Sequence, residues 1–265
     1  MSTFTDYMTI ANNLSRYQTM TAADPTVAQA TKYFQANIGN IKTADDFVNN
    51  TRIFNYVMTA FGLSDMTYAK SLIKQVLEQG TSRSTALANT LNNPKILALA
   101  QAFNFSLYGD QTTQTTAATS DAVNQYVMQT LETNEGNQNP GVELALYFQQ
   151  NASKITNGYS ILADKNLLTV VQTTLGISSY TSAQNIDLQA QQFDRVLKYS
   201  DFQNPTKVFN FLERFTAQYD FNNPNASAAP SSSLVTTLFD ASSSSSTSIS
   251  VNLLMSMQNL KLGGL

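Results

Sequence analysis

The chain has 265 residues, a net charge of −3 and a charged fraction of only 12%, with no cysteine and no histidine. Without cysteine there are no disulfides or thiolate metal sites, and without histidine the usual general base and transition-metal ligand are missing. We therefore expect a non-enzymatic protein with no catalytic residue, no metal and no cofactor. The 15 Lys and Arg residues are scattered, which argues against nucleic acid as a partner.

The N-terminal segment, residues 1–24, is predicted to be one amphipathic helix, because Tyr7, Ile10, Leu14 and Tyr17 recur at helical spacing. It lacks the basic stretch and apolar core of an ordinary signal peptide. No stretch of the sequence approaches the ~20 apolar residues of a membrane span. We expect a soluble protein that does not insert into membranes.

Residues 25–135 are predicted to form a first helical repeat. Helix starts are marked by Asp24-Pro25, by Asn93-Pro94 and by Thr43 with an acid three residues later, the pattern of a capping box. Apolar residues at helical spacing, such as Phe54, predict the buried faces. Residues 110–119 are rich in Thr and Gln, which predicts a flexible linker.

Residues 33–64 recur without a gap as residues 147–178, and the recurrence predicts a second helical repeat over residues 136–240. Leu168 takes the place of Phe54, and both are expected to be buried. Nine positions are identical between the copies: Tyr33/Tyr147, Phe34/Phe148, Gln35/Gln149, Asn37/Asn151, Ile41/Ile155, Val57/Val171, Thr59/Thr173, Gly62/Gly176 and Ser64/Ser178. The predicted fold is all-α, with two tandem similar helical repeats of about 112 residues packed as one elongated or bilobed protein.

The C-terminal region divides into a Ser-rich linker, residues 241–248, and an amphipathic helix, residues 249–265. A helix of so few turns is unstable alone in water, so it must bury its apolar face against the body or a partner. The residues predicted to bind a partner are Val251, Leu254, Met255 and Leu262.

Two acidic pairs are candidates for functional sites. Asp45 and Asp46 could bind a divalent cation, but their place in the first turn of a helix favours charge–dipole stabilisation. Glu132 and Glu135 could serve as acid and base on a sugar, but their spacing of three on a predicted solvated face argues against it. The sequence has none of the common glycine-rich nucleotide-binding loops and no nucleophile elbow.

The paired YFQxN…GLS/GIS units, the Asn-Pro helix starts in NNPKILALAQAF and QNPTKVFNFLERF, the lack of Cys and His and the amphipathic tail resemble the DUF1217 family. That family is bacterial, mainly alphaproteobacterial, and its genes often lie among flagellar genes. The shared motifs are packing motifs and carry no chemistry. The resemblance implies an association with the flagellum and with flagellar protein partners.

Three hypotheses follow. The first is a non-enzymatic structural or accessory protein located in the flagellum, or secreted by the flagellar type III apparatus without a cleaved signal peptide. The alternative is a cytoplasmic helical adaptor or chaperone-like protein that holds an amphipathic helix of a partner between its two halves. The third, a lytic or hydrolytic enzyme, has no motif in its favour.

Overall fold

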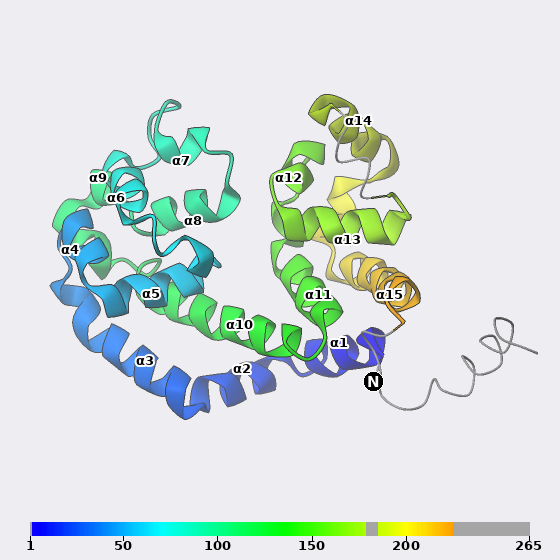
Figure 1. Ribbon diagram of the computed structural model, residues 1–265, viewed down its shortest axis with the longest axis horizontal. Helices are drawn as coiled ribbons and strands as arrows, with labels where there is room; N and C mark the ends of the chain where they lie inside the picture. Colours follow the sequence, from blue (N-terminus) through cyan, green and yellow to red (C-terminus); the bar gives the residue numbers. More distant parts are fainter. Residues whose placement is uncertain (1, 179–184, 225–265) are drawn as a thin grey trace, which may run out of the picture. The chain divides into compact units, whose positions relative to one another are not determined.

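The structure, a computed structural model, describes residues 2–178 and 185–224 (Figure 1). This part of the chain consists of α-helices and short 3-10 helices joined by turns, and it contains no strand. The prediction of an all-α fold is confirmed.

The helices before residue 115 are mostly short. In chain order they are α1 (Thr3–Ala11), α2 (Leu14–Ala23), α3 (Pro25–Asn37), η1 (Ile38–Asn40), α4 (Ala44–Asn49), α5 (Thr51–Ala60), η2 (Ser64–Met66), α6 (Lys70–Gln79), α7 (Leu87–Thr90), α8 (Pro94–Ala102), α9 (Phe105–Tyr108) and η3 (Gly109–Gln114).

The later helices include the two longest of the described residues, α10 and α15. In chain order they are α10 (Ser120–Gly136), α11 (Pro140–Asn151), η4 (Ala152–Lys154), α12 (Gly158–Leu162), α13 (Lys165–Leu175), α14 (Ile186–Val196), η6 (Tyr199–Gln203) and α15 (Pro205–Asn222).

Four helices begin in the same way, with an Asp or Asn followed by proline at the first helical position. The residues are Asp24, Asn93, Asn139 and Asn204, and each side-chain oxygen accepts a hydrogen bond from a first-turn N–H group. The cap satisfies a first-turn backbone N–H group that has no partner within the helix. Proline at the first position has no N–H group that would need a partner. The starts of α3 and α8 agree with the prediction.

The buried apolar side chains form two clusters. The first contains Phe34, Phe47, Phe54 and Phe103, which are fully buried and come from α3, α4, α5 and the end of α8. The second draws on α1, α10, α11, α12, α13, α14, η6 and α15. Its largest fully buried side chains are Tyr7, Phe148, Phe193 and Phe215.

Helix α10 belongs to both clusters. Ala122, near its start, is buried in the first cluster, whereas Met128 and Leu131 are buried in the second. The helix packs against both α5 and α11 (Figure 1), and Tyr126 stacks on Tyr56 of α5 with ring centroids 3.8 Å apart. The first cluster therefore ends and the second begins within α10. The boundary between the two predicted repeats lies further along the chain, near residue 136.

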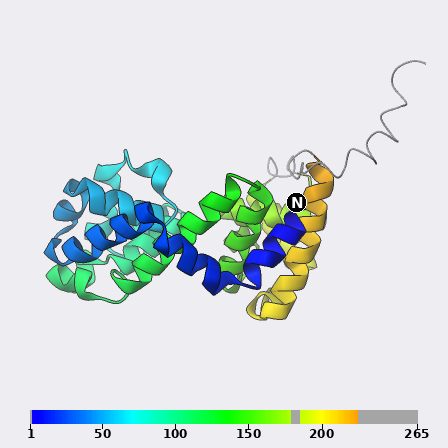
Figure 2. The ribbon, with the colours of Figure 1, turned by 90° about the horizontal axis from the view of Figure 1, so that it is seen from below.

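The N-terminal segment, expected to be a single helix, is two helices that break at Asn12 and Asn13. Asparagine side chains compete for backbone hydrogen bonds, which makes them poor inside helices. Helix α1 buries Tyr7 and Ile10 in the second cluster, where it lies against α11 and α15 (Figure 2). Helix α2 instead packs against α3 and α10.

Residues 110–119, predicted to be a flexible linker, are folded onto the first cluster. Thr112, Thr113 and Ala118 are buried, and the Thr113 hydroxyl donates to the Ile41 carbonyl oxygen at 2.9 Å. The threonine hydroxyls here bond to backbone carbonyls, so a segment poor in apolar residues still packs. The linker prediction was wrong for this reason.

Four elements follow in the same order near the start of each predicted repeat, and the described elements after them differ. Helices α3, η1, α4 and α5 are matched in turn by α11, η4, α12 and α13, and Gly62 and Gly176 follow α5 and α13 with φ of +65°. Phe54 is fully buried but Leu168 only half-buried, so the two positions differ. The tandem repeat as a pair of superposable units stays a prediction.

Candidate functional site

A cavity of about 470 Å³ lies between the two clusters. We call it the groove. One wall comes from the end of α5 and from α8, the floor from α10, and the other wall from α11 to α13. The lining residues are Ala60, Phe61, Pro94, Lys95, Leu97, Ala98 and Gln101; Gln125, Gln129 and Glu132; and Tyr147, Gln150, Asn151, Lys154, Ser160, Ala163, Asp164 and Leu167.

The lining mixes apolar and amide side chains. Phe61, Leu97, Ala98 and Leu167 supply apolar surface, and the amides come from Gln101, Gln125, Gln129, Gln150 and Asn151. Amide side chains both donate and accept hydrogen bonds, which suits them to polypeptide. The volume falls within the roughly 300–1,000 Å³ of typical ligand sites.

Glu132 lies in the floor of the groove and is only 3% exposed. Its carboxyl accepts a hydrogen bond from the side-chain amide of Gln150. Burial first, and then the negative charge of nearby Glu143, raise the pKa of Glu132 to about 8 against the opposing effect of Lys95. Glu132 is therefore a carboxyl held mostly neutral at pH 7, inside a cavity.

Tyr147 and Asp164 form a second buried pair on the α11–α13 wall. The Tyr147 hydroxyl donates to the Asp164 carboxylate, which also caps α13. Burial, and then the negative charge of Asp164, raise the pKa of the Tyr147 hydroxyl, so the phenol stays protonated. The pair holds the tyrosine ring in a fixed orientation beside the groove.

Lys95 brings a positive charge to the groove from the opposite wall. Its ammonium lies 5.1 Å from the centre of the Tyr147 ring and 3.4 Å from the Gly62 carbonyl oxygen. A cation over an aromatic face is attracted by the ring quadrupole. No ion pair joins Lys95 to Glu132 in the described part of the chain.

A smaller hollow of about 330 Å³ continues from the groove. It shares Pro94, Lys95, Ala163 and Asp164 with the groove and extends to Leu91 and Asp65. The starts of α8 and α13 therefore face a common space.

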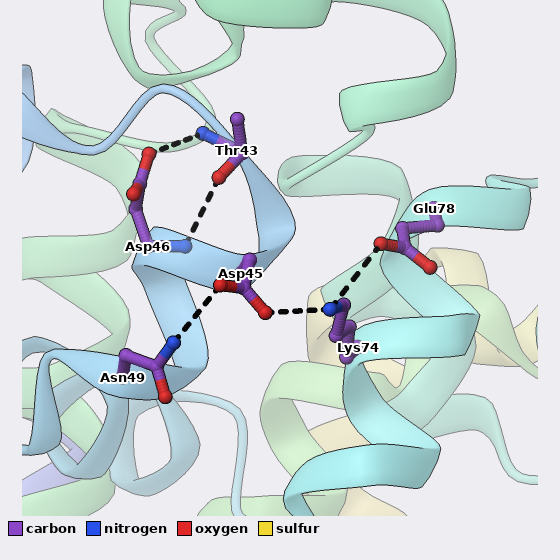
Figure 3. A network of polar contacts seen from close by, with 6 residues as sticks. All are labelled: Thr43, Asp45, Asp46, Asn49, Lys74 and Glu78. Atoms are coloured by element: carbon purple, nitrogen blue, oxygen red, sulfur yellow. Dashed lines mark hydrogen bonds and ion pairs between the residues drawn. The ribbon is translucent and has the colours of Figure 1, made fainter.

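The Asp45–Asp46 pair is structural (Figure 3). The Asp46 carboxylate accepts from the Thr43 N–H at 3.0 Å, and the Thr43 hydroxyl accepts from the Asp46 N–H, which completes the predicted capping box. Asp45 forms an ion pair with Lys74 at 2.5 Å and accepts from Asn49. No group of potential metal ligands occurs among the residues that the structure describes.

The expectation for Glu132 and Glu135 was wrong in one respect: Glu132 is not on a solvated face. The sequence does not reveal the burial of Glu132, because α11, the helix that packs against α10 here, lies further along the chain. Glu135 is half-buried, and burial raises its pKa. The predicted partner-binding residues Val251, Leu254, Met255 and Leu262 lie outside the described residues. No described helix is long and apolar enough to cross a membrane.

Residues 60–208 match the family model described as "Protein of unknown function (DUF1217)". This chain belongs to the DUF1217 family. The matched range includes every residue that lines the groove, so the groove lies within the DUF1217 region.

A solved structure is also similar to this DUF1217 protein: the X-ray crystal structure of protein AGR_C_984 from Agrobacterium tumefaciens. It has a TM-score of 0.80 and 38% sequence identity, with 84% of this chain and 97% of the other covered. No curated protein matches the chain.

Proposed function

We propose that this DUF1217 protein is a non-enzymatic structural or accessory protein of the flagellum, which holds an α-helical segment of a protein partner in its groove. The single observation that supports this best is the groove itself, with apolar surface on both walls and amide side chains between. Side chains of one face of a partner helix would fill the apolar parts, as in other helix-in-groove complexes.

The flagellar part of the proposal is supported by the family. Genes of the DUF1217 family often lie among flagellar genes, and the low charge and the lack of cysteine suit a protein exported by the flagellar type III apparatus. A cytoplasmic adaptor with the same groove is the alternative, and the two differ in location.

The location experiment uses the epitope-tagged full chain in its host. We expect the protein in sheared flagella or culture supernatant, and its loss from both when the export apparatus is deleted. Retention in the cytosol of cells with an intact apparatus would refute the flagellar location and favour the adaptor.

The groove experiment uses Ala98→Glu, which places a longer, charged side chain on the α8 wall. The matched control is Leu107→Glu, because Leu107 is 61% exposed and does not line the groove. We expect Ala98→Glu to reduce swimming motility and the control to leave it unchanged, with both variants folded by circular dichroism. Normal motility of a folded Ala98→Glu variant would refute a role for the groove.

A further inference from the structure

The groove holds a buried carboxyl that forms no ion pair with a cation among the described residues. Glu132 is 3% exposed, and the amide of Gln150 is its hydrogen-bond partner in the described part of the chain. Gln150 itself is exposed, so its side chain can move aside. Burying a carboxyl away from a countercharge is unfavourable, and a protein tolerates it by keeping the group neutral.

The wall beside Glu132 is built to receive positive charge. The Tyr147 ring already has a cation near its face, the Lys95 ammonium at 5.1 Å from the ring centre. The Tyr147 hydroxyl is fixed by Asp164, so the ring cannot turn away. The cavity between these groups is open enough to admit a further side chain.

We propose that the helical segment bound in the groove inserts a basic side chain, lysine or arginine, between Glu132 and the Tyr147 ring. This inference rests on the proposed function and adds the chemistry of the partner. The incoming cation would meet the Glu132 carboxylate directly, displace the Gln150 amide and share the ring face with Lys95. A neutral side chain would leave Glu132 protonated and gain no ion pair, and an acidic side chain would repel its carboxylate form.

Binding should then be linked to a proton. The titratable groups near Glu132 are Glu143 and Lys95, and the groove adds Tyr147, Asp164 and Lys154. Since the Glu132 pKa is about 8 in the free protein, the group is mostly protonated at pH 7. A bound cation favours the carboxylate, so binding at pH 7 releases a proton and tightens as pH rises through 8.

The test uses N-acetyl-arginine amide as the probe and N-acetyl-citrulline amide as its neutral counterpart, titrated into the full chain and followed by NMR. We expect the arginine probe alone to bind, with Glu132→Gln weakening it about tenfold or more. Glu78→Gln is the matched control, because Glu78 is exposed and does not line the groove. Lys95→Met should strengthen binding, since it removes the competing ammonium.

Equal binding of the two probes, no binding of either, or full binding to Glu132→Gln would overturn the inference. If Glu132→Gln does not fold, the test is proton release when the arginine probe binds to the wild-type protein. Calorimetry at pH 7 in two buffers of different ionisation enthalpy should detect this release. No proton release would overturn the inference. The proposed function fails separately, when Ala98→Glu keeps normal motility.

Discussion

The hydroxyl of Tyr147 donates a hydrogen bond to the Asp164 carboxylate, and this pair has no equivalent in the first predicted repeat. There the matching residues are Tyr33 and Asn50. Asn50 caps α5 through the Ile53 N–H at 3.1 Å, but Tyr33 instead lies under the Arg52 guanidinium, 3.6 Å from its ring centre. Of these two residue pairs, only Tyr147 and Asp164 place a carboxylate at the groove.

Replacing Tyr147 by Phe should destabilise the protein by about 1–3 kcal/mol, because the buried Asp164 loses its hydroxyl donor. The measurement is the free energy of unfolding from urea denaturation. Tyr33→Phe is the matched control, since no hydrogen bond of the Tyr33 hydroxyl is found in the described structure, and it should cost much less. Equal effects of the two substitutions would contradict the role given to the hydroxyl.

Glu132→Gln should stabilise the protein increasingly as pH rises. The Glu132 pKa is raised from 4.5 to about 8 by burial first, so the folded state binds more protons than the unfolded state between these values. Wild-type stability therefore falls as pH rises from about 4.5 to 8, by an amount on the order of a few kcal/mol from this group.

Glutamine does not titrate, so the stability difference between variant and wild type should be small near pH 4.5 and largest above pH 8. Chemical denaturation at several pH values measures it. A difference independent of pH would mean that folding does not shift the pKa of Glu132, as for a surface glutamate.

Phe54→Ala should cost about 3–5 kcal/mol, the usual range for emptying a large aromatic site in a packed core. Phe54 is fully buried and meets the Phe47 ring edge-on at 5.7 Å between ring centres. The half-buried Leu168 gives a useful comparison, and Leu168→Ala should cost clearly less. Denaturant midpoints at constant m value report both.

Gly158→Ala should weaken the packing of α12 on α14. A methyl group at Gly158 would lie 2.5 Å from the Ala190 carbonyl oxygen, and backbone cannot move aside cheaply. We expect a loss of about 1–3 kcal/mol, typical of overpacking. Gly39→Ala has room, with the nearest atom at 4.0 Å, and should be tolerated. An unchanged melting temperature of Gly158→Ala would indicate that α14 lies further from α12 than the 2.5 Å approach requires.

Deleting residues 249–265 tests the tail that carries Val251, Leu254, Met255 and Leu262. If these residues contact a partner in assembly, the truncated protein should melt like the full chain while motility is lost. A large fall in melting temperature would instead show that the segment belongs to the core.

Local signals predicted several of the helix starts. Asp24 and Asn93, each before a proline, and the Thr43 capping box need only residues within one turn, so the sequence contains the whole interaction. The burial of Glu132 and Thr113 depends on partners far along the chain: Gln150, 18 residues away, and the Ile41 carbonyl, 72 residues away. From composition alone, both residues are expected to be exposed to solvent. The groove depends on long-range contacts of this kind.

The packing of α1 constrains the order in which the chain folds during synthesis. Tyr7 donates to Gln149, 142 residues later, and the Thr3 N–H donates to Asp220, 217 residues later. At ribosomal rates of about 5–20 residues per second, the first helix waits roughly 10–40 s for its last contact. During that time its apolar face is available to chaperones or export factors, because α1 cannot complete its packing until α15 has been synthesised.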